Sequence, residues 1–256
     1  MEYYYTPKEN VNIEKNELLI DGFEFKHLTR VLRKTVGDLI VVTDGLLNVY
    51  ECKISMIENS RIICNIVDAK YNLYEQDINI SLFISPLKNV SRFEFAIEKA
   101  IELGVKSIQP VITEHTVSKN LFSKLKMERF NKIIIGAMGQ SQRCYLPLLN
   151  NTISFKEMLK STKDRINKIV MYEFSDETGK FVLDSSSKDV ALLIGPEGGF
   201  TGDEISNLSA HGWRVRSLGE RKLRAETATI ISLHDIFRNT LLTKEKYKPK
   251  STIPKQ

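Results

Sequence analysis

A glycine-rich loop late in the chain has the residue types and spacing of a ligand-binding turn. The segment "LLIGPEGGFTGDEI" (Leu192–Ile205) runs from an apolar stretch into glycine, proline and glutamate residues, and then into residues typical of a helix start. Thr201 and Glu204 have the spacing of a capping box, which marks a helix N-terminus. Gly195–Phe200 is therefore predicted to be a loop at the carboxyl end of a buried strand, the edge at which open α/β sheets bind ligands.

The composition of this loop excludes two common nucleotide-binding motifs. It is not a P-loop, because no Gly-Lys-Ser/Thr follows the glycines. It is not the dinucleotide-binding turn either, because the glycine spacing differs and Glu197 would repel a pyrophosphate. A carboxylate favours a cationic or neutral ligand. The alternative is a tight turn whose glycines only supply positive φ angles.

A second stretch, "SLGERKLRAETATI" (Ser217–Ile230), places charged side chains at another strand-to-helix junction. Arg221 and Arg224 stand three residues apart, and Glu226 and Thr227 begin the last predicted helix. Such a group could be a surface cluster of ion pairs, or it could hold a charged substrate. Both interpretations remain open from the residues alone.

Length and composition limit the classes of protein that can carry these stretches. The chain has 256 residues, 42% hydrophobic and 27% charged, which is typical of one large or two small globular domains. No signal peptide and no membrane-spanning run is expected. Three cysteines and four scattered histidines show no metal-ligand spacing, so no metal site is expected and the cytoplasm is the expected compartment. The net charge of +5 permits a polyanionic partner without requiring one.

The elements that must position these stretches fall into two groups. Up to about residue 72 the chain is rich in short β-branched runs, which predict a compact barrel with one helical stretch at 25–34. From Asp77 onward, predicted strands alternate with helices, which indicates a parallel α/β sheet. The strands are expected at 18–21, 37–45, 48–57, 61–67, 78–85, 107–113, 168–173, 189–195 and 213–218, and the later helices at 92–104, 126–143, 201–212 and 226–242. The predicted division is 1–72, 73–243 and a basic, disordered tail at 244–256, with the link at Asp68–Asp77.

Taken together, "GPEGGFTGDE" and "LGERKLRAETA" resemble the RsmE family of 16S rRNA (uracil-N3)-methyltransferases in the SPOUT superfamily. The resemblance covers the whole chain, because "HLTRVLRKTVGDLIVVTDG", "EKAIELGVKSIQPVITEHTV" and "QSQRCYLP" are similar to further family signatures. It implies an α/β fold with a C-terminal SPOUT trefoil-knot methyltransferase domain and a small N-terminal PUA-like β-barrel domain.

The resemblance also implies S-adenosyl-L-methionine as the cofactor, bound among three knot loops. In this chain those loops are Met171–Glu173, Ile194–Gly199 and Ser217–Thr227, with Leu218 and Leu223 as apolar walls for the adenine. The implied cofactor-binding residues are Met171, Tyr172, Glu173, Ile194, Gly195, Pro196, Glu197, Gly198, Gly199, Ser217, Leu218, Gly219, Leu223 and Thr227.

Methylation of uracil N3 requires loss of the N3 proton and alignment of the nitrogen with the methyl group. A cation would favour the anionic base and a carboxylate could accept the proton, and Arg224 and Glu226 are the candidates. The sequence does not decide between these two roles. Arg221 is expected to hold RNA phosphate.

Basic residues of the N-terminal domain are the other candidates for RNA binding. His27, Arg30, Arg33 and Lys34 have helical spacing, with Leu28, Val31 and Leu32 expected on the opposite side. Arg143 is a further candidate. Tyr3–Tyr5 stand where relatives often carry an arginine, and they are expected to stack on a base. Gly139 stands where relatives often carry a longer residue, which argues against a side-chain role there.

The resemblance implies 16S rRNA in the 30S subunit as the partner, with no membrane. It also implies a homodimer formed through the last helix, with Ile230, Ile231, Phe237 and Leu241 at the interface. Two alternatives remain: a non-catalytic RNA-binding or ribosome-assembly factor, and a SPOUT methyltransferase that acts on another RNA such as tRNA.

Overall fold

The computed structural model describes residues 2–118, 124–178 and 182–241. Within these residues the chain forms two compact units. The first unit holds residues 2–75 and 134–146, and the second holds 76–133 and 147–241. The expected boundary at residue 72 did not include the return of the chain at 134–146 to the first unit. The predicted tail at 244–256 lies outside the described residues.

In the described part of the first unit, a six-stranded sheet has the order β1-β4-β5-β6-β3-β2. Its strands pair antiparallel except for β1 and β4, which are parallel. Short connections between β-branched runs favour such a meander. The elements are β1 (Tyr3–Tyr5), η1 (Lys8–Asn10), β2 (Val11–Asn12), β3 (Glu17–Ile20), α1 (Gly22–Lys26), η2 (His27–Val31), β4 (Leu39–Thr43), β5 (Asn48–Ile57) and β6 (Ile62–Tyr71).

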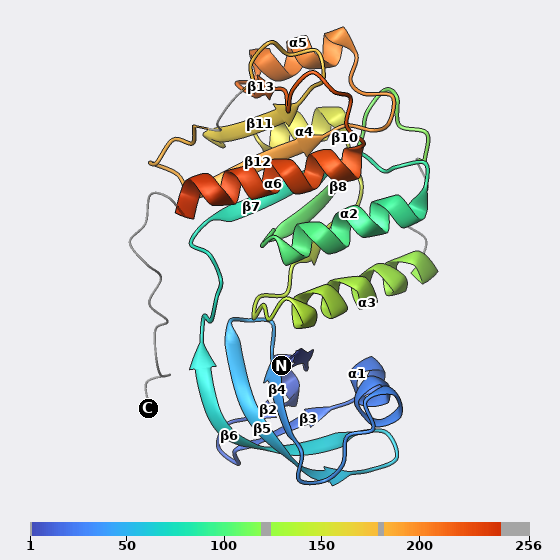
Figure 1. The fold of residues 1–256 in the computed structure, drawn as a ribbon, viewed down its shortest axis with the longest axis vertical. Coiled ribbons are helices and arrows are strands. Elements are labelled where there is room, and N and C mark those ends of the chain that lie inside the picture. The colour runs from blue at the N-terminus through green and yellow to red at the C-terminus, as the bar shows by residue number, and fades with distance from the viewer. Residues whose placement is uncertain (1, 119–123, 179–181, 242–256) are drawn as a thin grey trace. The chain divides into compact units, whose positions relative to one another are not determined.

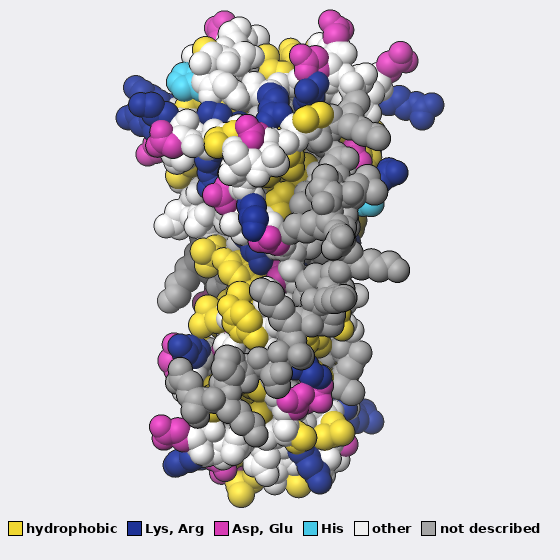
Figure 2. All heavy atoms as spheres, turned by 90° about the vertical axis from the view of Figure 1, so that its left-hand side faces the viewer, with side chains coloured by type: hydrophobic (Ala, Val, Ile, Leu, Met, Phe, Trp, Pro, Cys, Tyr) yellow, Lys and Arg dark blue, Asp and Glu magenta, His cyan; other side chains and the backbone are white. Residues whose placement is uncertain are grey.

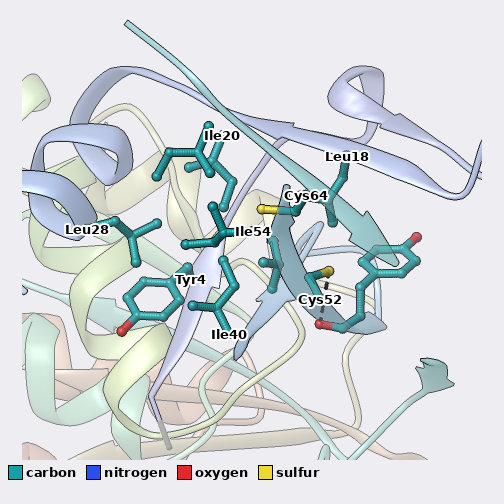
Figure 3. Packing of buried hydrophobic residues seen from close by; sticks show 11 residues of the cluster. Tyr4, Leu18, Ile20, Leu28, Ile40, Cys52, Ile54 and Cys64 are labelled. Atoms are coloured by element: carbon teal, nitrogen blue, oxygen red, sulfur yellow. Dashed lines mark hydrogen bonds between the residues drawn. The ribbon is translucent and has the colours of Figure 1, made fainter. Parts of the chain in front are cut away.

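The core of this unit consists of side chains that alternate along the strands and face the same side of the sheet (Figure 3). Ile40, Cys52, Ile54 and Cys64 pack together with at most 1% of their surface exposed. Burial raises the pKa of the Cys64 thiol to about 12, so this side chain is a neutral core group at physiological pH. The thiols of this barrel therefore pack as small apolar groups.

The structure corrects two expectations for this unit. Tyr3 and Tyr4 lie in strand β1 and are buried, so they are core residues and are not available to stack on a base. The regular helix expected over 25–34 ends early, because His27–Val31 forms a wide π-type turn and Arg33 has a φ of +52°. Consequently Val31 and Leu32 are exposed, and only Leu28 of the expected apolar side is buried.

Gly139 has a packing role that its position in the sequence did not reveal. A Cβ atom added there would lie 2.2 Å from the carbonyl oxygen of Tyr3, closer than any real contact. The segment that follows Gly139 also joins the first unit, because the amide of Leu47 donates to the carbonyl of Cys144 and the amide of Leu146 to that of Gly45. Glycine at 139 therefore lets a helix pass close to strand β1.

The described part of the second unit is built on a seven-stranded parallel sheet in the order β10-β8-β7-β12-β11-β13, with β9 beside β8 (Figure 1). All the strand pairs are parallel, as the alternation of strands and helices predicted. The strands are β7 (Asn79–Ile84), β8 (Ser107–Ile112), β9 (Leu148–Leu149), β10 (Ile153–Ser154), β11 (Asn167–Met171), β12 (Asp189–Ile194) and β13 (Arg214–Arg216).

Helices cover both faces of this sheet. On one face, α4 (Phe155–Ser161) and α5 (Gly202–Ala210) pack against Phe83, Ala191 and Leu193 of the central strands. The helices α2 (Val90–Glu102) and α6 (Ala225–Leu241) lie side by side, as Figure 1 shows. The helix α3 (Lys124–Gln140) crosses the boundary between the units. Because the central strands are buried on both sides, they read as continuous apolar runs in the sequence.

Candidate functional site

The candidate site lies where the carboxyl ends of parallel strands share one edge of the second sheet. The loops that follow β12, β11 and β13 meet there, because these three strands are neighbours in the order β12-β11-β13. Together with the start of α6 they line a cavity of about 430 Å³, which we call the loop pocket. Three segments that are separate in the sequence therefore form one site, at the edge where α/β sheets bind ligands.

Most of the sequence-predicted residues line the loop pocket. The predicted residues found there are Met171, Tyr172, Glu173, Ile194, Gly195, Pro196, Glu197, Ser217, Leu218, Gly219, Arg221, Leu223, Arg224 and Glu226. Gly198 instead lines a neighbouring cavity, and Gly199 and Thr227 are in neither lining set. Arg92 also lines the pocket and was not predicted, and Lys222 was included only as part of the predicted loop Ser217–Thr227. The loop "SPLKN" joins β7 to α2, and Arg92 lies in the first turn of that helix. This strand-to-helix junction was the sequence signal that could have identified Arg92.

The glycine-rich loop is a compact turn fixed by its own backbone. The amide of Gly199 donates to the carbonyl of Pro196 at 2.9 Å, and Gly199 has a φ of +69°. A Cβ on Gly195 would lie 2.9 Å from the ring of Phe200, which packs beneath the loop. At both positions a side chain would force the turn to change shape.

Glu197 holds this loop to the next strand end. Its carboxylate accepts a hydrogen bond from the backbone amide of Lys88 at 3.0 Å. Lys88 follows β7, the neighbour of β12 in the sheet. The carboxylate that the sequence assigned to a ligand therefore has a backbone partner in this structure, while it still lines the pocket.

A buried carboxylate and a chain of hydroxyls support the same loop from the other side. Glu204 closes the predicted capping box with Thr201 and also accepts from the amide of Glu114 at 3.0 Å. The turn that contains Glu114 is fixed by Thr113 and Thr116, whose hydroxyls lie 2.9 Å apart. This turn presents His115, whose Nδ1–H donates to the carbonyl oxygen of Gly198 at 3.0 Å.

The charged residues of the pocket include one loose ion pair, between Arg92 and Glu226, and two exposed arginines, Arg221 and Arg224. Arg224 precedes α6, and its carbonyl accepts from the amide of Ala228 at 2.8 Å. The carboxylate of Glu226 lies 3.8 Å from Nε of Arg92, and its side chain is only 12% exposed. A positive charge at the N-terminus of a helix interacts unfavourably with the helix dipole, so Arg224 does not stabilise α6. Glu226, in the first turn, has the favourable sign.

A second ion pair in the pocket, between Glu173 and Lys222, is shorter than the pair between Glu226 and Arg92. Glu173 accepts from Nζ of Lys222 at 2.9 Å across the mouth of the loops. The hydroxyl of the buried Ser217 donates to the carbonyl of Gly219 at 3.1 Å and fixes the turn after β13. Leu218 and Leu223 are half-buried and supply apolar surface between these polar groups. The pocket thus combines apolar walls with acids and bases at its rim.

The structure corrects the expectation that Arg143 contacts RNA. Arg143 is 6% exposed, and its guanidinium donates two hydrogen bonds of 3.0 Å to the carboxylate of Glu75. A buried bidentate pair of this kind holds the fold together. The sequence could not reveal it, because the partner lies 68 residues away.

Of the other proposed RNA-binding residues, Arg30 and Arg33 are exposed and His27 and Lys34 are half-buried. His27 lies 3.9 Å from the carboxylate of Glu24, whose pKa is raised by burial to about 7. The face drawn in Figure 2 carries basic and acidic side chains interspersed with one another, without a field of one sign. The early end of the helix leaves these four residues without the regular face that the sequence predicted.

In the part of the chain that the structure describes, no three His, Cys, Asp or Glu side chains come together as a metal site. No helix among the described residues has the length and apolar character needed to cross a membrane.

Comparisons with known proteins agree with this geometry. Residues 74–236 match the family model of an RNA methyltransferase domain, and residues 20–67 match that of an RNA methyltransferase PUA domain. Ribosomal RNA small subunit methyltransferase E of Bacillus subtilis is 29% identical, covering 94% of this chain and 98% of the relative. The Synechocystis protein of the same name is 31% identical, covering 86% of this chain and 71% of the relative.

Solved structures show the same fold over more than nine tenths of the chain. A ribosomal RNA small subunit methyltransferase E from Neisseria gonorrhoeae, bound to S-adenosylmethionine, has a TM-score of 0.82 and 27% identity, with 94% of this chain and 98% of the other covered. A Legionella pneumophila protein in complex with the same cofactor has a TM-score of 0.80 and 29% identity, with 93% and 97% covered.

The fold and the site therefore define an RNA methyltransferase with an N-terminal PUA-like domain and a parallel-sheet α/β domain. More narrowly, the chain belongs to the family of ribosomal RNA small subunit methyltransferase E.

The geometry of the glycine-rich loop gives a prediction for its backbone. Gly199→Val is expected to weaken binding of S-adenosylmethionine at least about tenfold, because a β-branched residue is strained at a positive φ by about 1–3 kcal/mol. Calorimetry with the purified variant measures this affinity. Gly202→Ala is the matched control, since a Cβ there meets nothing within 4 Å. Normal affinity in a folded Gly199→Val variant would contradict the role of this loop.

Proposed function

We propose that this chain transfers the methyl group of S-adenosylmethionine to N3 of a uridine in the 16S rRNA of the small ribosomal subunit, in the cytoplasm. The observation that carries the proposal is the convergence of the three motif loops on one pocket at the carboxyl edge of the sheet. Two structural relatives were crystallised with this cofactor, and the curated relatives are named for small-subunit ribosomal RNA.

The residues of the loop pocket fit the proposed cofactor. Leu218, Leu223 and Ile194 offer apolar walls that suit an adenine ring, and the backbone of Gly195 and Gly219 is open to polar groups. Glu173 and Glu197 carry negative charge toward a ligand whose sulfonium and amino groups are positive. When bound, the cofactor supplies a methyl group already activated for displacement. We also propose that these loops belong to a trefoil knot of the chain.

The chemistry left to the protein is the activation and alignment of the uracil. N3 must lose its proton before the nitrogen lone pair can form the new N–C bond, while the sulfur keeps the electrons of the bond that breaks. We assign to Arg224 the stabilisation of the negative charge that develops on N3 and its flanking oxygens. We assign to Glu226, whose carboxylate faces Arg92, the role of proton acceptor.

The proposed RNA-binding surface consists of basic side chains in both units. Arg221 at the mouth of the pocket, and Arg30 and Arg33 in the N-terminal unit, are exposed cations suited to phosphate contacts. His27 and Lys34 remain proposed contacts with a smaller exposed surface. Such contacts would fix the register of the RNA without reading its sequence.

The proposal is tested with purified protein, labelled S-adenosylmethionine and 30S subunits from a strain that lacks the gene. Transfer of label to 16S rRNA supports it. Cofactor binding without transfer to any RNA would favour the non-catalytic ribosome-assembly factor instead. Transfer of label to tRNA and not to 16S rRNA would favour the second alternative, a SPOUT methyltransferase that acts on another RNA.

We also propose that the chain acts as a homodimer. Phe237 was expected at this interface, but its ring is buried within the second unit, where a Cβ on Gly104 would lie 3.0 Å from it. The side chain of Leu241 lies outside those described. What supports the dimer is exposed apolar surface on the two neighbouring helices: Phe95 of α2 is 43% exposed and Ile231 of α6 is 37% exposed.

The dimer gives a prediction for Ile231. Light scattering of the wild type is expected to give about twice the chain mass of 29.3 kDa. Ile231→Glu is expected to shift the protein toward the monomer, because it would bury a carboxylate in the interface. A wild-type monomer at micromolar concentration would contradict the dimer.

A further inference from the structure

A second cavity lies directly beside the loop pocket, and we call it the side pocket. Its lining comes from the ends of the neighbouring strands β7, β8 and β12, so the two cavities occupy the same edge of the sheet. They share two lining residues, Arg92 and Glu197. The glycine-rich loop therefore forms the wall between them, with Gly198 on the side pocket.

The side pocket is lined by basic groups. Lys88, Arg92 and His115 contribute to it, and Lys88 and His115 are exposed to solvent. Its one carboxylate among the described lining residues, Glu197, accepts from the backbone amide of Lys88. The lining side chains thus carry a net positive charge.

His115 is oriented toward this cavity by its backbone partners. Its Nδ1 donates to the carbonyl oxygens of Gly198 and Gly199 at 3.0 and 3.2 Å, which leaves Nε2 for a ligand. The turn that carries His115 is fixed by the buried hydroxyls of Thr113 and Thr116 and by the carboxylate of Glu204. The imidazole is therefore held in place before any ligand arrives, as a preorganised binding group should be.

Methyl transfer imposes a geometric requirement that this cavity meets. The nucleotide that is methylated must leave its stack and place its base against the cofactor, so its ribose and phosphate need room next to the cofactor pocket. We propose that the side pocket receives the backbone of the target nucleotide, with Lys88 and Arg92 around its phosphate and His115 beside its ribose. This inference rests on the proposed methyl transfer.

Arg92 has a particular place in this arrangement because it lines both cavities. Its Nε faces Glu226 across 3.8 Å, which is too long for a firm hydrogen bond. A phosphate in the side pocket would draw the guanidinium toward itself and leave the carboxylate of Glu226 free beside the uracil. Occupation of the side pocket would thus prepare the proposed proton acceptor.

The test compares Lys88→Gln, His115→Gln and the double variant with the wild type. Single-turnover methylation is measured against the concentration of 30S subunits at several salt concentrations, with cofactor affinity measured in parallel by calorimetry. Lys88→Gln is expected to raise the half-saturating subunit concentration about tenfold and to reduce the salt slope by about one, as expected for one phosphate contact. For Lys88→Gln the cofactor affinity is expected to stay near the wild-type value, because Lys88 does not line the loop pocket.

The matched control is Lys156→Gln, which removes an exposed lysine from α4. An unchanged half-saturating concentration and salt slope in the double variant would overturn the inference. If the wild type transfers no methyl group to the subunits, the proposed function fails. In that case sedimentation of each variant with 30S subunits still tests the side pocket as a phosphate site.

Discussion

Arg224→Ala is expected to lower the rate of methyl transfer about a hundredfold, with the affinity for S-adenosylmethionine close to that of the wild type. Arg224 lines the loop pocket from the position just before α6, where a cation does not stabilise the helix. Its guanidinium interacts most strongly with the uracil when negative charge develops on the base. Loss of one such charged contact costs on the order of 3 kcal/mol in the transition state and little in the ground state.

Single-turnover methylation of 30S subunits measures this rate, and calorimetry measures the cofactor affinity. Arg224→Lys keeps the charge and should recover part of the rate. Arg238→Ala, an exposed arginine in the last turn of α6, is the control for the fold and should have the wild-type rate. A near-normal rate in Arg224→Ala would move the charge-stabilising role to Arg221 or to the N-terminal unit.

The second large effect concerns stability. Glu75→Gln is expected to lower the free energy of unfolding by about 3 kcal/mol or more, because it leaves the buried charge of Arg143 without its carboxylate. The two side chains are 7% and 4% exposed, so water cannot replace the lost partner. Urea unfolding followed by circular dichroism measures the change.

A surface pair provides the comparison. Asp77→Asn removes the carboxylate that faces Lys188, and both side chains of that pair are more than half exposed. Its expected cost is below about 1 kcal/mol, since solvent screens exposed ion pairs. Equal effects of the two substitutions would show that the Glu75–Arg143 pair is not the structural element that its burial indicates.

The fold of the second unit could be predicted well because its signals are local. Continuous apolar runs such as Val190–Ile194 favour central strands of a parallel sheet, and glycine and proline residues mark where they end. The capping box of Thr201 and Glu204 located the start of α5 and is present in the structure. The meeting of the three loops was predicted only from the family resemblance, and in the structure they meet because β12, β11 and β13 are neighbours in the sheet.

What the sequence did not reveal depends on pairing between distant segments. Tyr3 and Tyr4 read as exposed aromatic residues until strand β1 is placed beside β4. Arg143 reads as a surface cation until Glu75 is placed against it. The side pocket depends on His115 and Lys88, which no motif links and which only the order β8-β7-β12 brings together.

Mapping the position of the transferred methyl group is the most direct test of the proposed methylation of uridine N3 in 16S rRNA. Unmodified 30S subunits are incubated with the protein and labelled S-adenosylmethionine, and the 16S rRNA is digested and analysed by mass spectrometry. We expect one added methyl group per 16S rRNA molecule, on N3 of a single uridine, and none with Arg224→Ala on the same time scale. A methyl group on ribose, on another base or on tRNA, or no transfer despite cofactor binding, would contradict it.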